Sequence, residues 1–441
     1  MKGGAIGVML ILLSHPAIAE ETESWMNKIK VSGTVETEWA VTPDDGAGQK
    51  FETIIQPEFN TDLTDNASLT AILRLRADAY DKLEPGRPDE DSSSPFSRRL
   101  LIGDNVDAEL REFYVDTFVG DTFLRLGKQQ IVWGQADGLK VLDVVNPQSF
   151  REFILDEFDD SRIPLWTVNA EIPVGNDSRV QLLWIPDTTY HDLPERDASY
   201  AFTTSRLVPV APVGFNVMIN KEDRPTNIFT DSDVGARFST FYEGWDLTLN
   251  YLYHYNDTAV LYRTVGPGTA TINPEYERTH LIGGTASNAF GDFTLRSEVG
   301  YSTNSFFVTQ NATDIDGIEE SGEASYVIGL DYSGITDTFL SGQFFQSVLA
   351  DDVDGVTRDD VENTVTFLAE RTFVNEIWKA ETLFIHSLND DDGVIRPKLN
   401  YEYASNINVW VGADIFYGKS DGLFGQFNNE DRIYVGFEWG F

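Results

Sequence analysis

Few residues of this chain have the types and spacing that catalysis requires. The sequence contains no cysteine, which excludes a thiolate metal site, a cysteine nucleophile and disulfide bonds. His386 precedes Ser387, and a histidine beside a hydroxyl is the pair that activates a nucleophile in some hydrolases. Adjacent residues of a β-strand point to opposite faces, so these two side chains cannot readily pair. We therefore predict that the protein is not an enzyme.

Four short acidic runs, each with an Asp-Gly pair, are the candidates for cation binding, because clustered carboxylates suit Ca²⁺. A calcium-binding loop has acidic residues at positions one, three and five, Gly at six and Glu at twelve. Aligned on Gly317, position one is Ala312, and aligned on Gly355 it is Ala350, so the pattern is incomplete. We expect no metal and no other cofactor. The weak metal candidates are Asp314, Asp316, Asp352 and Asp354.

The overall charge bears on the choice of partner. The chain has 32 Lys and Arg against 72 Asp and Glu, which gives a net charge of −40 at pH 7. Such a polyanion repels nucleic acid, whose phosphates are bound mainly by basic side chains. We therefore expect no nucleic acid among the partners.

Alternating polarity is the main pattern of the chain from residue 30 onward. Between residues 245 and 255, aromatic and leucine side chains alternate with mostly polar ones, so one face of the segment is apolar. Runs of about ten such residues, joined alternately by short turns and longer polar loops, are typical of transmembrane β-barrels. The predicted strands span residues 30–40, 51–61, 67–79, 106–118, 121–131, 165–172, 178–186, 233–242, 245–255, 276–288, 292–303, 321–332, 336–347, 361–373, 376–387, 393–404, 407–418 and 430–441.

The length and number of these runs predict a membrane barrel with a wide lumen. Strands of about 11 residues at ~3.3 Å per residue and ~40° tilt span roughly 28 Å, which matches an apolar band of ~25 Å. About 18 strands make a barrel too wide for side chains to fill, so we expect an aqueous or loop-plugged lumen. The predicted fold class is all-β: a transmembrane antiparallel β-barrel of about 18 strands, with 16 the alternative.

The chain divides into three predicted segments. Lys2, the apolar residues 5–13 and the small residues 17–19 resemble a signal peptide, so we expect residues 1–19 to be removed on export. Residues 20–29 are expected to form a short periplasmic segment. Residues 30–441 form one transmembrane barrel domain, because no linker or abrupt change of composition divides them.

The connection from residue 131 to residue 164 departs from the strand pattern. Asn146 is a good helix N-cap and Pro147 a good first residue, and several apolar residues up to Phe158 fall on one helical face. We predict a short helix here, in a long external loop. Its apolar face must be buried, either inside the barrel mouth as a constriction or against the rim as a brace, and the sequence leaves both open.

Charged side chains lie on the polar face of many predicted strands and on this connection. Rings of charge in a lumen can orient and select a solute. They can equally form ion pairs that hydrate and stiffen the wall, and the pattern does not separate these roles. The candidate pore and constriction residues are Trp133, Asp137, Asp143, Asn146, Arg151, Arg162, Arg74, Arg76, Arg125, Arg296 and Glu298.

The segment 126–175 also resembles a known family. The matching positions are Gly127, Gln129, Trp133, Gly134, Asp137, Asp143, Asn146, Pro147, Arg162, Pro164 and Trp166. They are similar to the signature of a proteobacterial outer-membrane β-barrel family that is catalogued as a domain of unknown function. The resemblance implies a porin-like protein with no assigned catalysis, encoded in some genomes beside RND-type exporters of hydrophobic molecules.

The sequence thus predicts a porin-like channel or transporter for a small, amphipathic or hydrophobic solute, located in the outer membrane of a Gram-negative bacterium. The alternatives are an outer-membrane hydrolase and a surface-binding, adhesin-like structural barrel. Expected partners are outer-membrane lipid and lipopolysaccharide and, by the resemblance, an inner-membrane RND-type exporter. Residues 433–441 alternate apolar residues up to Phe441, and such a terminal strand resembles the signal that the barrel-assembly machinery recognises.

Overall fold

The computed structural model describes residues 28–441 except residues 89, 209–213, 312–313 and 354. Within these residues, 18 strands form a closed antiparallel barrel, so the predicted fold is confirmed and the alternative of 16 strands is wrong. The predicted signal peptide and most of the predicted segment 20–29 lie outside the described residues. No helix in the described part of the chain is long and apolar enough to cross a membrane.

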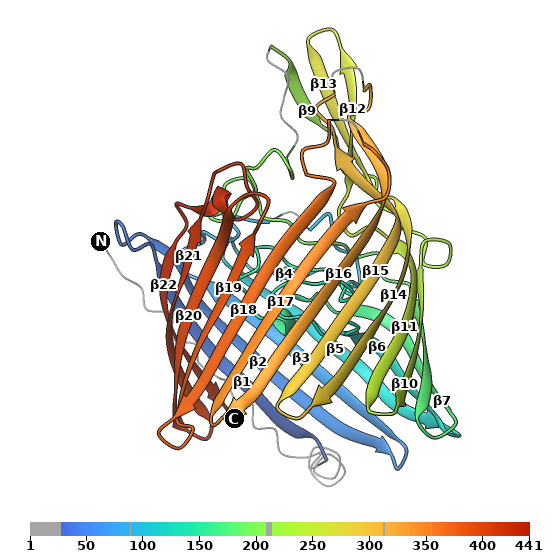
Figure 1. The fold of residues 1–441 in the computed structure, drawn as a ribbon, viewed down its shortest axis with the longest axis vertical. Coiled ribbons are helices and arrows are strands. Elements are labelled where there is room, and N and C mark those ends of the chain that lie inside the picture. The colour runs from blue at the N-terminus through green and yellow to red at the C-terminus, as the bar shows by residue number, and fades with distance from the viewer. Residues whose placement is uncertain (1–27, 89, 209–213, 312–313, 354) are drawn as a thin grey trace, which may run out of the picture.

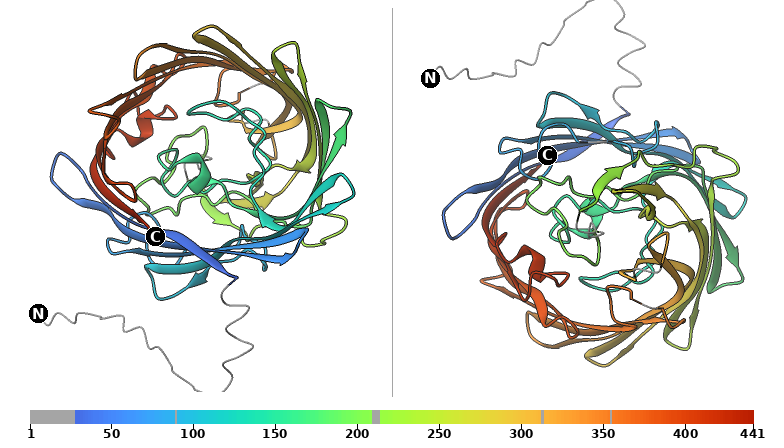
Figure 2. Two further views of the ribbon diagram at one scale, coloured as in Figure 1. Left: turned by 90° about the horizontal axis from the view of Figure 1, so that it is seen from below. Right: turned by 90° about the horizontal axis from the view of Figure 1, so that it is seen from above.

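The barrel strands follow one another around the ring in chain order (Figures 1 and 2). They are β1 (Lys30–Val41), β2 (Gly48–Thr64), β3 (Ala67–Asp78), β5 (Val106–Val119), β6 (Thr122–Gln129), β7 (Leu165–Val174), β8 (Ser178–Ile185), β10 (Asp233–Tyr242), β11 (Trp245–Tyr255), β14 (Arg278–Phe290), β15 (Phe293–Val308), β16 (Ile318–Ile335), β17 (Thr338–Leu349), β18 (Val361–Phe373), β19 (Trp378–Ser387), β20 (Asp392–Ala404), β21 (Ile407–Tyr417) and β22 (Arg432–Gly440).

The first and last strands close the ring. β1 pairs with β22 over eight residues, with Val35 opposite Trp439. Beyond the strand end, Gly33 and Phe441 exchange two backbone hydrogen bonds, of 3.1 and 3.0 Å. A closed ladder leaves no sheet edge exposed, which is the condition for a sheet to lie in lipid.

The two faces of the wall differ in polarity as the alternation predicts. On β11 the side chains of Leu249 and Tyr251 are exposed on the outer face, whereas Thr248 and Asn250 are buried on the inner face. The outside therefore suits lipid, and the inside carries the polar and charged residues.

Short turns and long loops lie at opposite ends of the barrel (Figure 1). Above the rim on the loop side, β9 (Asn216–Ile219), β12 (Val260–Gly266) and β13 (Thr269–Glu275) form a separate three-stranded sheet. A further short strand, β4 (Leu100–Leu101), pairs with β5. The alternation did not predict these four strands, because they lie in connections that we treated as loops.

The connection between β6 and β7, residues 130–164, folds into the barrel, and we call it the lumenal loop (Figure 2). The prediction of a helix from Asn146 to Phe158 is wrong in its position. The helix α2 (Phe158–Ser161) has four residues and begins where the predicted helix ends. Instead of capping a helix, the Asn146 side chain accepts a hydrogen bond from the Ile131 amide at 2.7 Å and donates one to the Ile163 carbonyl at 2.9 Å.

Two backbone features explain the absence of that helix. Gln148 forms a β-bridge with Arg162, which holds this part of the chain extended. Phe153 has a φ of 56°, a left-handed conformation that interrupts a right-handed helix. The apolar residues of the segment therefore serve contacts with the barrel wall and not a helical face.

Candidate functional site

The lumenal loop is anchored first to the wall at β8 and β10. Trp133 is fully buried, and its indole N–H donates to the Gln181 side-chain oxygen at 2.9 Å. Gly235 leaves space for the ring, because a Cβ atom there would lie 3.0 Å from the Trp133 indole. Trp133 therefore fixes the place where the chain leaves the wall.

A second anchor joins the loop to β15. The Glu298 carboxylate is 3% exposed and accepts hydrogen bonds from the backbone amides of Gln135 and, at 3.3 Å, of Leu142. The neighbouring inward-facing residue, Arg296, forms ion pairs with Asp137 of the loop and, at 2.8 Å, with Asp331 of β16. The predicted residues Asp137, Arg296 and Glu298 thus come together at one contact.

Three other predicted residues hold the two arms of the loop together. Arg162 contacts the Asp143 carboxylate through two nitrogens, at 2.7 and 2.8 Å, and both side chains are buried. Lys140 lies 3.4 Å from the same carboxylate. With the Asn146 contacts to residues 131 and 163, this pair makes the loop a closed unit.

A third anchor lies where the first and last strands meet. Arg151 pairs with Glu52 of β2 at 2.6 Å. The adjacent Glu152 pairs with Lys50 at 2.8 Å and with Arg432 of β22 at 2.6 Å. All five side chains are buried, where a charge that loses its partner is costly.

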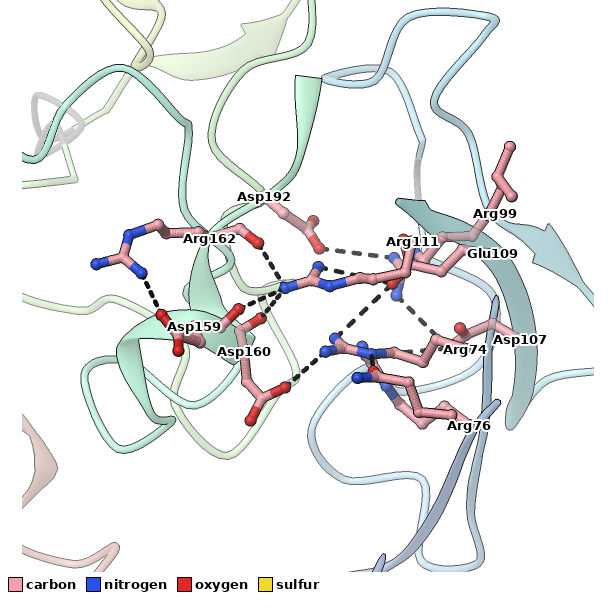
Figure 3. A network of polar contacts seen from close by, with 12 residues as sticks. Arg74, Arg76, Arg99, Asp107, Glu109, Arg111, Asp159, Asp160, Arg162 and Asp192 are labelled. Carbon is pink, nitrogen blue, oxygen red and sulfur yellow. Dashed lines mark hydrogen bonds and ion pairs between the residues drawn. The ribbon is translucent and has the colours of Figure 1, made fainter. Parts of the chain in front are cut away.

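A fourth contact joins the loop to β3 and β5 (Figure 3). Arg74 pairs with Asp160 at 2.6 Å, and Arg111 donates to the carbonyl oxygens of Asp159 and Arg162, each at 2.7 Å. Arg76 lies nearby, 3.8 Å from Glu52. Arg74 and Arg111 hold the helix α2 against the wall.

On the β19–β21 side the loop is held by apolar packing. Phe153 lies at the centre of a cluster and contacts Phe427 with a ring-centroid distance of 4.8 Å. The cluster comprises Leu83, Phe153, Leu155, Tyr200, Ile385, Val394, Phe416, Phe424 and Phe427. This packing buries apolar side chains of the loop against the wall.

Space remains beside the loop. A cavity of about 430 Å³ lies between the lumenal loop and the wall, and its lining includes Lys140, Asp143 and His254. A second cavity, of about 230 Å³, lies between the loop and β18–β22, with Asp156, Arg396 and Lys398 in its lining.

A third cavity, of about 390 Å³, lies against β6–β11 and is lined by residues that include Arg125, Glu171 and Arg237. Of the predicted pore residues, Asp137, Asp143, Asn146 and Arg125 line these three cavities. Arg76 and Arg151 line a smaller one, of about 30 Å³.

Burial shifts the protonation of two loop residues that line cavities. It lowers the pKa of Lys140 to about 8. It raises the pKa of Asp156 to about 7, and the nearby Glu152 carboxylate adds to that effect. The charge along the lumen therefore changes near neutral pH.

The weak metal candidates have other roles or lie apart. One Asp314 carboxylate oxygen accepts the amides of Asp316 and Gly317, at 3.0 and 2.7 Å, as in an ordinary Asx-type turn. Asp352 is exposed, and Asp354 is outside the described residues. Among the residues that the structure describes, no group of three or more His, Asp or Glu side chains could hold a metal ion.

His386 does not form a pair with Ser387. Its ring is stacked with that of Phe384, two residues away on the same strand, and its Nδ1 lies 3.0 Å from the Tyr417 hydroxyl. The alternation of β19 places Ser387 on the other face of the wall, which was the reason for predicting no catalytic role.

Several residues of the site were missed. Lys50 immediately precedes the predicted strand 51–61, and Glu152 lies within the segment predicted as a helix; only their ion pair reveals their role. Arg111 was missed because a bulge in β5 opposite Ile72 and Leu73 adds one residue, so the alternation changes phase. As a result Glu109 and Asp116 both face inward, although six residues lie between them and strict alternation would place them on opposite faces.

An apolar exterior and a charged lumen partly filled by an inserted loop define a porin-like β-barrel of the outer-membrane type. Residues 103–375 match the model of a family described as "Protein of unknown function (DUF1302)". The chain belongs to this family, as its motifs predicted. No curated protein matches the chain.

Solved structures share the fold at low sequence identity. Pseudomonas aeruginosa OpdK with vanillate is 12% identical, with a TM-score of 0.51, and the match covers 94% of this chain and 99% of that one. An improved crystal structure of Pseudomonas aeruginosa OccK1 (OpdK) gives 12% identity, the same coverage and a TM-score of 0.50. The outer membrane channel DcaP of Acinetobacter baumannii gives 8% identity, a TM-score of 0.42 and coverage of 94% and 97%.

Proposed function

We propose that the protein is an outer-membrane channel that carries a small solute past the lumenal loop. The observation that supports this best is the position of the loop: it lies inside the barrel, is anchored to the wall at four places, and leaves cavities beside it. A barrel that served as an anchor alone would need neither a wide lumen nor a constriction inside it.

The smallest of the three cavities beside the loop, about 230 Å³ between the loop and β18–β22, is part of the proposed path. Its lining combines acidic side chains with basic ones and with leucines; the acidic residues are Asp137, Asp156, Glu157 and Glu381, and the basic ones are Arg396 and Lys398. Charges of both signs beside apolar surface suit a polar or amphipathic solute better than a bare ion of either sign.

Single-channel conductance in planar bilayers tests this function. Deletion of residues 136–160 should raise the conductance several-fold, because it removes the loop and leaves the ladder of the wall intact. A matched control is deletion of residues 260–275, which belong to the sheet above the rim and should leave the conductance within about twofold. Protein that conducts no ions in any of the three forms would contradict the proposal.

The location of the channel is part of the same proposal. The apolar outer face and the terminal strand up to Phe441 support insertion into the outer membrane of a Gram-negative bacterium by the barrel-assembly machinery. Fractionation of native membranes by density checks the location, and recovery with the inner membrane would exclude it.

A further inference from the structure

The wall of the barrel has a notch above β6. β5 pairs with β6 along Phe113–Val119, and β6 ends at Gln129, where the chain turns into the lumen. Within the described residues, the upper part of β5, from Val106 to Glu112, has no partner in β6. The lumenal loop and the notch therefore have one cause: the chain leaves the wall early.

The notch opens at the level of the lipid. The seven-residue ladder between β5 and β6 covers roughly 18 Å at ~3.3 Å per residue and ~40° tilt, less than the ~25 Å apolar band of such barrels. On the neighbouring β3, Leu73 and Leu75 point outward, exposed, and Leu75 lies opposite Ala108 in the upper part of β5. The apolar outer surface thus continues above the end of β6.

Residues 92–102, which we call the flap, cover this notch. They belong to the connection between β3 and β5 and include β4, which pairs Leu100 with Ala108 and Leu101 with Asp107. The Trp166 indole of β7 donates to the Phe96 carbonyl at 3.2 Å. Phe96, Leu100 and Ile102 are 72%, 66% and 51% exposed, so the flap presents apolar side chains to the outside.

Behind the flap the surroundings are charged (Figure 3). Arg99 points inward and pairs with Glu84 at 2.8 Å, with Glu90 at 2.9 Å and with Asp192 at 3.6 Å. Below it, Arg111 reaches the lumenal loop. The flap therefore has charged groups on its inner side and apolar side chains on its outer side at the same height of the barrel.

Side chains also take the place of the ladder at the edge of the notch. The Lys128 ammonium donates to the Leu110 carbonyl at 2.9 Å, just above the last pair of β5 and β6. The Ser97 hydroxyl donates to Asp187 at 2.6 Å. Opening this part of the wall would break the two residue pairs of β4, the ion pairs of Arg99 and single side-chain contacts. Opening it on the other side of β5 would break a ladder of eleven residue pairs with β3.

We infer that the flap is a lateral gate through which an amphipathic molecule passes between the lumen and the surrounding lipid. An apolar tail would leave towards the exposed face of the flap, while a polar head stays among the charged groups behind it. The inference rests on the proposed channel function, since the lumen must give access to the gate from the other side.

A disulfide between the flap and the wall, which we call the lock, tests the gate. Because the chain has no native cysteine, the two introduced cysteines can pair only with each other within one molecule. Leu100→Cys with Ala108→Cys joins β4 to β5 at directly opposed positions, where the Cα separation suits a disulfide. The matched control, Leu247→Cys with Ala286→Cys, joins an outward pair of β11 and β14 that is already in the ladder. The probe is hexadecanoate bearing a diazirine, mixed into vesicles that contain the purified protein and activated by light.

Mass spectrometry then measures labelling of the lumenal loop. We expect the oxidised lock to reduce it about tenfold, reductant to restore it, and the control disulfide to leave it unchanged. Trp166→Phe removes the bond to the Phe96 carbonyl and should raise labelling about threefold, which keeps the test open if the lock variant does not fold. Equal labelling with the lock open and closed, or none in the native protein, would overturn the gate.

Potassium conductance measured on the same vesicles separates the two proposals. The lock should leave conductance unchanged, because the path for ions runs along the barrel axis. Native protein that conducts no ions but shows lock-sensitive labelling would contradict the channel and support the gate. Normal conductance with lock-insensitive labelling would do the opposite.

Discussion

Replacing Glu298 by alanine should release the start of the lumenal loop from the wall. The carboxylate accepts the amides of Gln135 and Leu142 from within a nearly dry contact. After the substitution both amides lose a charged acceptor. The contacts of Arg296 with Asp137 and with the Gln135 carbonyl, and the two hydrogen bonds between Gln343 and Asp137, remain.

The size of the effect follows from the two bonds that Glu298 accepts. Hydrogen bonds to a charged group contribute roughly 1.5–3 kcal/mol each, so the two together contribute about 3–6 kcal/mol. Water can reach part of the released segment, and we therefore take a loss of about 3 kcal/mol. Since about 1.4 kcal/mol is a tenfold change in an equilibrium constant, the undocked fraction should rise on the order of 100-fold.

Amide hydrogen exchange of residues 133–145 measures this fraction directly, and single-channel current noise should rise in parallel. Glu171→Ala is the matched control, because Glu171 is also an inward-facing carboxylate and its ion pair is with Arg179 of the wall. Exchange in Glu298→Ala that equals that of the native protein would refute the role assigned to this carboxylate.

Three further outcomes are expected. Docking of the loop raises the pKa of Asp156 from 3.8 to about 7, so between these pH values the docked loop carries a proton on Asp156 that the free loop has released. Docking is therefore strongest below about pH 4 and weakens as the pH rises to about 7. Asp156→Asn should remove this pH dependence of docking, measured as amide hydrogen exchange of the lumenal loop between pH 4 and 8. Arg432→Ala leaves Glu152 and Asp414 without that partner and should cost about 3–5 kcal/mol in urea unfolding, whereas an unchanged midpoint would contradict a buried network. Deletion of Phe441 removes its two bonds to Gly33 and should lower the yield of folded, heat-modifiable barrel, and a normal yield would count against the terminal strand as an assembly signal.

The barrel was predictable because lipid and water impose opposite demands on alternate residues of every strand. That demand extends along the whole strand, so even β15 and β16, which reach beyond the predicted ranges, were found near the right residues. The demand ends at the rim, and β12 and β13 were therefore missed although they are regular strands.

The contacts inside the lumen were less predictable. The sequence marked Asp137, Arg151 and Arg296 as charged and inward, but their partners lie far along the chain, as with Arg151 and Glu52, 99 residues apart. No local pattern encodes such a pair. The prediction of a helix at Asn146 was wrong for the same reason. Its capping signal is local, whereas the contacts of Asn146 that override it are with residues 131 and 163.

The position of Glu152 has a consequence for the order of assembly. Its partners are Lys50 on the second strand and Arg432 on the last, 280 residues further along the chain. Until the last strand has joined the first, this carboxylate lacks one of its cations, and until the loop has docked, the buried Arg432 lacks one of its anions. Docking of the lumenal loop and closure of the barrel therefore stabilise each other. We therefore expect the loop to dock as the barrel closes, so that a closed barrel with an undocked loop is a minor species during assembly.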